Sequence, residues 1–198
     1  MILEGIVTTL DAEGILNVAP MGPRVDDAEL RRLELRPYPS TTTYRNLREQ
    51  GEGVFHVTDD VLLLAQAAIG QPRDVATRPA EVVWGRVLLG ACRYVEFRVL
   101  ELDDRGPRAT IRAEAVAGGR LRDFFGLNRA KHAVVEAAIL ATRTEFLPAE
   151  EILAEIGKLA VLVEKTGGAA ERTAFDLLED HVRRMTRGRG GDRIGREP

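Results

Sequence analysis

Residues 36–60 read RPYPSTTTYRNLREQGEGVFHVTDD, and this stretch combines a helix start, a helix end and a strand. Its two prolines exclude a helix before Ser40, and the hydroxyl residues that follow are typical of an N-cap and a first helical turn. A glycine at position 51 ends the helix that would begin near Thr42. The β-branched and aromatic residues from 54 to 58 then predict a strand that returns into a sheet.

Four consecutive hydroxyl side chains stand at the start of this predicted helix: Ser40, Thr41, Thr42 and Thr43. The first turn of a helix has backbone N–H groups without internal partners and the positive end of the helix dipole, so added hydroxyl donors suit a phosphate group. The alternative interpretation is an ordinary N-cap followed by spare threonines. The local pattern leaves both interpretations open.

The composition predicts a globular protein of one domain, or of one domain with a substantial appendage. Of the 198 residues 44% are apolar, which suffices for a core. The net charge of −3 gives no reason to expect a nucleic-acid or membrane partner. No signal peptide or bilayer-spanning segment is apparent, so we expect a cytoplasmic protein. A single cysteine and three scattered histidines give no indication of a disulfide or a zinc site.

The N-terminal residues predict a hairpin with a polar residue in its second strand. Strand-like residues 2–10 and 15–19 flank a turn at 11–14. Asn17 is the polar member of the second strand and needs hydrogen-bonding partners. The following residues are mostly small, and Pro20 cannot donate a hydrogen bond to a strand ladder. A flat ligand could therefore approach the backbone closely. The alternative interpretation is an edge strand that ends in a proline turn. The residues concerned are Ala19, Pro20, Met21 and Gly22.

The remaining pattern predicts an α+β fold. Strands are expected at 81–90, 92–103 and 108–118, with a turn at 103–107 between the last two, so the first 118 residues hold at least six strands, enough to close a small barrel. Residues 27–36 could form a strand or a helical turn. Helices are expected at 61–69 after Asp59-Asp60, at 127–142, at 148–164 and at 169–185. We therefore expect a barrel domain over 1–122, a helical subdomain over 123–186 and a flexible basic tail over 187–198.

Three cationic side chains lie in the first turn of the helix expected from residue 127: Arg129, Lys131 and His132. A cation at this end opposes the helix dipole by a few tenths of a kcal/mol, and a nearby anion would reverse that sign. The alternative is a surface turn whose cations pair with acids such as Glu136. The sequence does not decide between them.

Two patterns carry a family resemblance. Gly14-x-x-Asn17-x-Ala19-Pro20 and Thr43-x-x-Asn46-Leu47-x-x-x-Gly51 resemble motifs of flavin-reductase-like proteins in the FMN-binding split-barrel superfamily. The second family motif carries Lys-Asp-Thr, where this chain has Thr41-Thr42-Thr43, so the family lysine is absent here.

A closer resemblance, along nearly the whole chain, is to the domain-of-unknown-function family 447. The shared motifs are Ile6-Val7-Thr8-Thr9, Asn17-Val18-Ala19-Pro20-Met21-Gly22, Thr43-Tyr44-Arg45-Asn46-Leu47, Asn128-Arg129-Ala130-Lys131, Glu136-Ala137-Ala138-Ile139 and Lys165-Thr166-Gly167-Gly168. This resemblance implies a split β-barrel with a C-terminal helical extension, FMN as cofactor, and a homodimer. It implies cofactor binding by Asn17, Ala19, Pro20, Met21 and Gly22 near the isoalloxazine, by Ser40, Thr41, Thr42 and Thr43 near the phosphate, by Asn46 in the same motif, and by Arg129 and Lys131 as further anion contacts.

The function expected from the resemblance is an FMN-dependent oxidoreductase of the flavin-reductase type, with a nicotinamide or deazaflavin donor or a small-molecule substrate. The alternatives are a non-enzymatic flavin carrier or accessory protein of tetrahydromethanopterin-linked one-carbon metabolism, and a structural dimer module without a cofactor. No Cys, His or Tyr forms an evident catalytic constellation in the sequence, which fits a protein whose cofactor supplies the chemistry.

Overall fold

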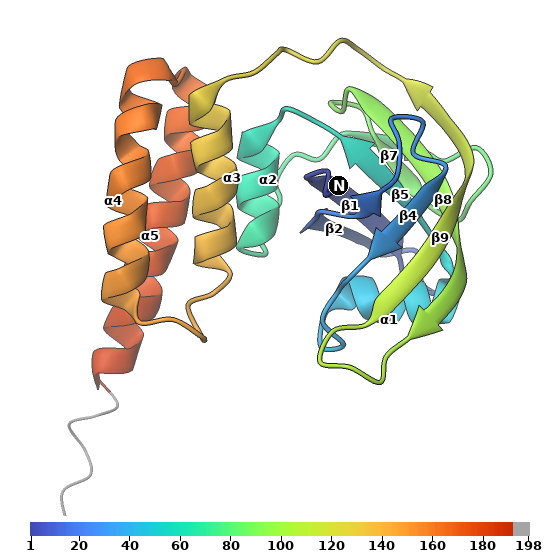
Figure 1. The fold of residues 1–198 in the computed structure, drawn as a ribbon, viewed down its shortest axis with the longest axis horizontal. Helices are drawn as coiled ribbons and strands as arrows, with labels where there is room; N and C mark the ends of the chain where they lie inside the picture. Colours follow the sequence, from blue (N-terminus) through green and yellow to red (C-terminus); the bar gives the residue numbers. More distant parts are fainter. Residues whose placement is uncertain (192–198) are drawn as a thin grey trace, which may run out of the picture. The chain divides into compact units, whose positions relative to one another are not determined.

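The computed structural model describes residues 1–191 and divides into two compact units (Figure 1). The barrel unit comprises residues 1–60 and 74–125, and the helical unit comprises residues 61–73 together with the described chain from 126. The predicted domain boundary at residue 122 places residues 61–73 in the barrel domain. They belong to the helical unit because α2 (Val61–Ala68) packs against the C-terminal helices α3 and α5.

A seven-stranded antiparallel sheet forms the barrel unit, in the order β2-β1-β5-β8-β9-β4-β3. Figure 1 shows how strongly this sheet curls. A bridge between Ile2 and Arg24 joins β3 to the segment before β1, and the Leu3 N–H donates to the Pro23 carbonyl at 3.1 Å. The strands are β1 (Gly5–Leu10), β2 (Leu16–Met21), β3 (Arg24–Val25), β4 (Arg32–Leu35), β5 (Glu52–Val57), β8 (Arg93–Asp103) and β9 (Thr110–Arg120).

This contact closes the barrel between β3 and the segment before β1. Strand β2 is not part of the closure and lies at the edge of the sheet, beside β1. Pro20 is compatible with β2 for that reason, because an edge strand has one side on which no ladder hydrogen bond is required. The expectation of an α+β split barrel is confirmed. Residues 32–35 form a strand, which decides between the two alternatives left open for 27–36.

Inside the barrel, the apolar faces of the strands and of α1 (Thr42–Gln50) enclose one core. Phe55 and Phe97 are fully buried at its centre, and α1 contributes Tyr44 and Leu47. The helix begins and ends where the sequence indicates. Thr41 is its N-cap, and Gly51 adopts a left-handed conformation with φ 69° at its C-cap.

The predicted strand over 81–90 was wrong in extent. The structure has a short second sheet of β6 (Thr77–Pro79) and β7 (Arg86–Leu88), and residues 81–85 form the turn between them. The cause lies in β8, where the fully buried carboxylate of Glu96 accepts the backbone N–H groups of three turn residues. These donors are Glu81 at 2.8 Å, Val82 at 2.7 Å and Val83 at 3.2 Å. N–H groups held by a carboxylate are not available to a strand ladder.

The helical unit contains α2, α3 (Arg129–Ala141), α4 (Ala149–Thr166) and α5 (Ala169–Gly191), so the three predicted C-terminal helices are confirmed. Buried alanines on α3, such as Ala133 and Ala137, allow its neighbours to approach closely. Helix α5 includes the first residues of the predicted tail, and the rest of that tail lies outside the described residues. No helix within the described chain is long and apolar enough to cross a membrane.

His56 links β1, β5 and β7 from a fully buried position. Its Nδ1 lies 3.2 Å from the Ile6 carbonyl, and its Nε2 lies 3.0 Å from the Leu88 N–H. One nitrogen must donate and the other accept, which fits the neutral ring with its proton on Nδ1. Burial lowers the pKa of His56 from 6.5 to about 4.

We expect acidification to destabilise the protein through His56. The unfolded chain binds a proton below pH 6.5, but the folded chain does so only below about pH 4, so the stabilisation is complete above 6.5 and is lost as the pH falls through this window. Between pH 7 and pH 5 the unfolding free energy should fall by about 2 kcal/mol. Urea denaturation across this range measures the slope. His56→Gln should flatten it, whereas His132→Gln, on the surface of α3, should keep it; equal slopes in all three proteins would contradict the assignment.

Candidate functional site

The two sequence motifs nominated for cofactor binding meet in one hydrogen-bonded cluster of the barrel unit. Thr9 on β1 is its centre: the Thr9 hydroxyl accepts the Asn17 Nδ2 at 3.1 Å and the Asn46 Nδ2 at 3.0 Å. The Asn17 amide also donates to the Thr43 hydroxyl at 3.0 Å. Thr9, Thr43 and Asn46 are buried and Asn17 is half-buried. The cluster therefore fixes the first turn of α1 against the β1–β2 hairpin.

Sequence reasoning identified Asn17, Thr43 and Asn46 but missed Thr9. A signal for Thr9 was present, because the hairpin with its turn at 11–14 pairs Thr9 directly with Asn17 in register. A hydroxyl and an amide that face each other across two strands form a cross-strand hydrogen bond.

The hydroxyl side chains at the start of α1 divide between the two interpretations. Thr41 is committed to capping, since its hydroxyl accepts the Tyr44 N–H at 3.3 Å and donates to the Tyr38 carbonyl at 2.8 Å. Ser40 and Thr42 are exposed, and the backbone N–H groups of Thr42 and Thr43 form no hydrogen bond with any described residue. The Thr41 hydroxyl is thus a helix cap. The hydroxyls of Ser40 and Thr42 and the backbone N–H groups of Thr42 and Thr43 remain beside it as donors.

Arg45 adds a positive charge to this open turn. Its Nη2 donates to the Thr42 hydroxyl at 3.0 Å, and the side chain is exposed. A cation beside the N-terminal turn opposes the helix dipole, so an anion bound there would be favoured by the amides and by the guanidinium together. The sequence analysis did not nominate Arg45, although its i,i+3 spacing from Thr42 places the two on the same face of the helix.

The segment that follows Asn17 comprises the end of the edge strand β2 and the residue after it. Ala19, Pro20, Met21 and Gly22 are all half-buried. A Cβ atom at Gly22 would lie 2.8 Å from the Ile2 side chain and 2.9 Å from the Glu4 carboxylate, so a larger residue here would displace these two exposed side chains. The side of β2 away from β1 carries no sheet partner among the described strands.

In the helical unit, Arg129 and Lys131 differ in their surroundings. Asn128 caps α3 by accepting the N–H groups of Ala130 at 2.9 Å and Lys131 at 3.2 Å. The Lys131 Nζ lies 2.9 Å from the Glu171 carboxylate, and this bond is the main reason that the pKa of Glu171 is lowered. The charge of Lys131 is therefore already compensated. Arg129 is exposed and forms no ion pair with a described residue, which keeps it as a candidate anion ligand.

Metal-binding side chains do not converge in the part of the chain that the structure describes. No group of three His, Cys, Asp or Glu residues there could hold a metal ion. His56 has both ring nitrogens engaged, and Cys92 is buried with its pKa raised, chiefly by burial. The open first turn of α1 combines backbone N–H groups that have no described partner with the Arg45 guanidinium, in front of the Thr9-centred cluster.

This fold recurs in solved structures, among them the following three. An FMN-bound protein of family DUF447 from Methanosarcina mazei matches with a TM-score of 0.78 and 24% identity over 91% of this chain and 94% of that one. Nitrilotriacetate monooxygenase component B from Bacillus cereus matches with a TM-score of 0.52 and 19% identity over 61% of this chain and 70% of that one. An FMN-binding protein from Thermus thermophilus with bound 1-cyclohex-2-enone matches with a TM-score of 0.52 and 16% identity. The match covers 60% of this chain and 70% of that one.

The sequence itself matches one family in two parts. Residues 3–122 match the N-terminal domain described as "Protein of unknown function (DUF447)", and residues 128–180 match a second region with the same description. The two regions together span most of the chain and follow the barrel-to-helix order of the structure. The chain belongs to the DUF447 family.

Proposed function

We propose that this protein is an FMN-binding flavoprotein whose phosphate site is the first turn of α1. The observation that carries the proposal is the Thr9-centred cluster, which holds Asn17, Thr43 and Asn46 together behind open amides and the Arg45 guanidinium. The FMN-bound relative of the same family supports the choice of ligand.

In this proposal the phosphate accepts hydrogen bonds from the N–H groups of Thr42 and Thr43, from the Ser40 and Thr42 hydroxyls, and from Arg45. The Thr41 hydroxyl contributes indirectly by capping the helix. Such charge-assisted bonds are about twice as strong as neutral ones, and the helix dipole adds to them. Thr43 has a second role, because its hydroxyl accepts from Asn17 and thereby sets the position of that amide.

The isoalloxazine would lie along the free side of β2, beside Asn17 and the backbone of residues 19–22. Small side chains and a strand edge without a sheet partner provide close access to a flat ring. We propose that a second copy of the chain completes this shallow site, making the functional unit a homodimer.

The proposed activity is that of an oxidoreductase of the flavin-reductase type, in which bound FMN supplies hydride chemistry and the protein supplies binding and orientation. Anaerobic mixing of the FMN-loaded protein with NADH, NADPH and reduced deazaflavin tests the activity. We expect one donor to bleach the visible absorbance of the flavin; no bleaching with any of them would exclude the reductase proposal but not FMN binding.

The proposed site would serve equally in a second function, that of a flavin carrier or an accessory protein of tetrahydromethanopterin-linked metabolism. Calorimetric titration with FMN and with a tetrahydropterin separates the two. Tight FMN binding without donor oxidation indicates a carrier, whereas tight pterin binding with weak FMN binding would replace the cofactor assignment.

A further inference from the structure

A cleft opens in the barrel unit where β9 continues past the end of β4. Its volume is about 440 Å³, which lies within the range of small-molecule sites. Strand β4 pairs with residues 111–114 of β9, whereas residues 117–120 pair with β8 alone among the described strands. The side of β9 that faces away from β8 is therefore open there. The cleft is lined by Glu29, Arg93, Val95 and residues 115–120.

Two arginines face each other in the wall of this cleft. Arg93 on β8 and Arg120 on β9 are directly opposite in the register of the two strands, and both line the cleft. Like charges in such a cross-strand pair destabilise a sheet. Arg120 also pairs with Asp123, but the two side chains are 73% and 78% exposed, so this pair compensates its charge weakly. An anion between the two arginines would turn the repulsion into attraction.

The guanidinium of Arg93 is held by the loop that forms the other wall of the cleft. Its Nη1 donates to the Ala28 carbonyl at 2.6 Å, and its Nη2 donates to the Glu29 carbonyl at 2.8 Å. The loop is anchored by Leu30, whose side chain is buried and whose N–H donates to the Asp27 carboxylate at 3.0 Å. Because a guanidinium has five N–H donors, Arg93 keeps further donors for a ligand. Its charge is thus positioned before any ligand binds.

Backbone groups of β9 and an apolar side chain complete the cleft. The Leu121 N–H donates to the Cys92 carbonyl at 2.8 Å, on the side of β8. Successive residues of an antiparallel strand direct their backbone groups to opposite sides, so those of Arg120 and Gly118 point to the open side. Val95 is buried and gives the cleft an apolar floor. Donors, cations and apolar surface therefore lie together.

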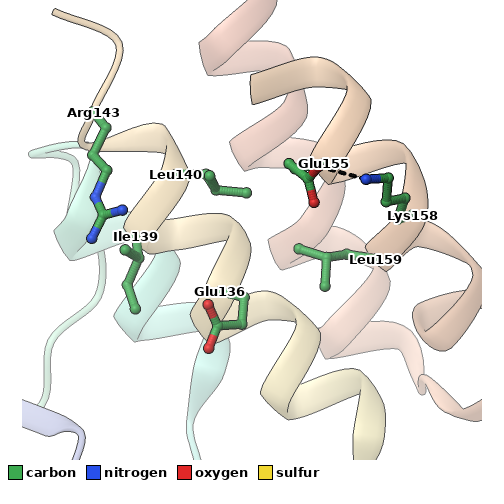
Figure 2. A pocket seen from close by; sticks show the side chains of 7 residues that line it. All are labelled: Glu136, Ile139, Leu140, Arg143, Glu155, Lys158 and Leu159. Atoms are coloured by element: carbon green, nitrogen blue, oxygen red, sulfur yellow. Dashed lines mark hydrogen bonds and ion pairs between the residues drawn. The ribbon is translucent and has the colours of Figure 1, made fainter. Parts of the chain in front are cut away.

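The groove between α3 and α4 in the helical unit has a different charge pattern (Figure 2). Two acids and two bases line it together with three apolar side chains, and Glu155 and Lys158 pair with each other at 2.6 Å. The charges in its lining balance, so they do not select an ion. The barrel cleft has two arginines against one acid, Glu29, and this excess of positive charge favours an anion.

We infer that the barrel cleft binds a small organic carboxylate. The carboxylate accepts hydrogen bonds from Arg93 and Arg120 and from the open backbone N–H groups, and the apolar body of the ligand packs on Val95. Arginine suits this role because its planar guanidinium matches a carboxylate in a two-bond geometry. An inorganic anion would leave the apolar floor uncovered. The cleft shares no residue with the proposed FMN site, so the inference does not depend on the cofactor.

Titration with benzoate, followed by protein NMR, tests the inference. Benzoate joins one carboxylate to a flat apolar body, and we expect a dissociation constant on the order of 1 mM, which is usual for so small a ligand. Benzyl alcohol lacks the charge, and acetate lacks the apolar ring. Each of these two compounds should bind at least roughly tenfold more weakly than benzoate.

Two substitutions should shift the benzoate affinity in opposite directions. Arg120→Met removes a cation and should weaken binding roughly tenfold, whereas Glu29→Gln removes the acid and should strengthen binding about twofold to threefold. Arg120→Met should leave the melting temperature of the ligand-free protein nearly unchanged, because it removes an exposed ion pair and also relieves the repulsion from Arg93. A loss of affinity at an unchanged melting temperature is not a folding defect.

Two control variants locate the effect. Arg112→Met removes a cation from the same strand outside the cleft, and Arg143→Met removes one from the α3/α4 groove. Both should bind benzoate as the original protein does. Weaker binding in either control, or equal binding in Arg120→Met and the original protein, would overturn the inference.

Three further results would also contradict a carboxylate site: no binding of benzoate, equal binding of benzyl alcohol or acetate, and weaker binding in Glu29→Gln. The titration is repeated with saturating FMN, which should leave the benzoate affinity unchanged. Displacement of benzoate by FMN would assign the cleft to the cofactor and overturn the inference. The first titration requires no FMN, so a failure of the cofactor proposal would leave its result intact.

Discussion

The double substitution Thr42→Val and Arg45→Met should lower the affinity for FMN by roughly a hundredfold or more. Each of the two substitutions removes a donor to the phosphate, and a charge-assisted hydrogen bond contributes about 1.5–3 kcal/mol when it is well formed. The fold should survive, because both side chains are exposed and the Thr41 cap is retained. Titration calorimetry with FMN and with riboflavin measures the effect. Riboflavin has no phosphate and should bind to both proteins with nearly the same affinity.

Two control variants make this result specific. Arg32→Met removes an exposed charge at the start of β4 and should leave FMN binding unchanged. Thr41→Ala removes the N-cap, which costs about 1 kcal/mol of stability, and should weaken both ligands through the helix. If FMN and riboflavin weaken equally in the double variant, the phosphate does not bind at α1, and Arg129 becomes the next candidate.

Glu96→Ala should destabilise the barrel by roughly 3–5 kcal/mol. The substitution leaves three backbone N–H groups, those of Glu81, Val82 and Val83, without their acceptor, and each unpaired buried donor costs about 1–3 kcal/mol. Among these three residues Glu81 and Val82 are exposed and Val83 is buried, so solvent compensates part of the loss and keeps the total below the largest sum. Chemical denaturation measures the loss, and proteolysis within residues 80–85 should accelerate in the variant.

The control for this prediction lies on the same strand. Glu101 pairs with Arg112 at 2.6 Å, but both side chains are 60% exposed, so Glu101→Ala should cost less than about 1 kcal/mol. Similar losses for the two variants would mean that Glu96 does not hold the turn.

Local signals in the sequence were sufficient for α1, for the first hairpin and for the C-terminal helices. Caps, glycines and proline positions act over a few residues, and Thr41 and Gly51 have the predicted roles. The same signals predicted the bounds of α2 but could not show to which unit it belongs. Its place in the helical unit depends on packing with α3 and α5.

The interactions that depend on tertiary contacts were the ones that sequence reasoning missed. Thr9 gains its role from the simultaneous approach of β2 and α1, and Glu96 gains its role from a turn more than ten residues earlier in the chain. Lys131 shows the converse: its sequence neighbours suggested Glu136 as a partner, but the fold places Glu171 beside it. Such pairings are set by helix packing rather than by spacing along one helix.

Calorimetric titration of the cofactor-free protein with FMN and riboflavin, followed by thermal unfolding of the same samples, tests the central claim most directly. We predict that FMN binds more tightly than riboflavin and that FMN at 100 times its dissociation constant raises the unfolding free energy by about 2.7 kcal/mol. No binding heat together with an unchanged melting temperature in the presence of FMN would contradict the claim and would favour a structural module without a cofactor.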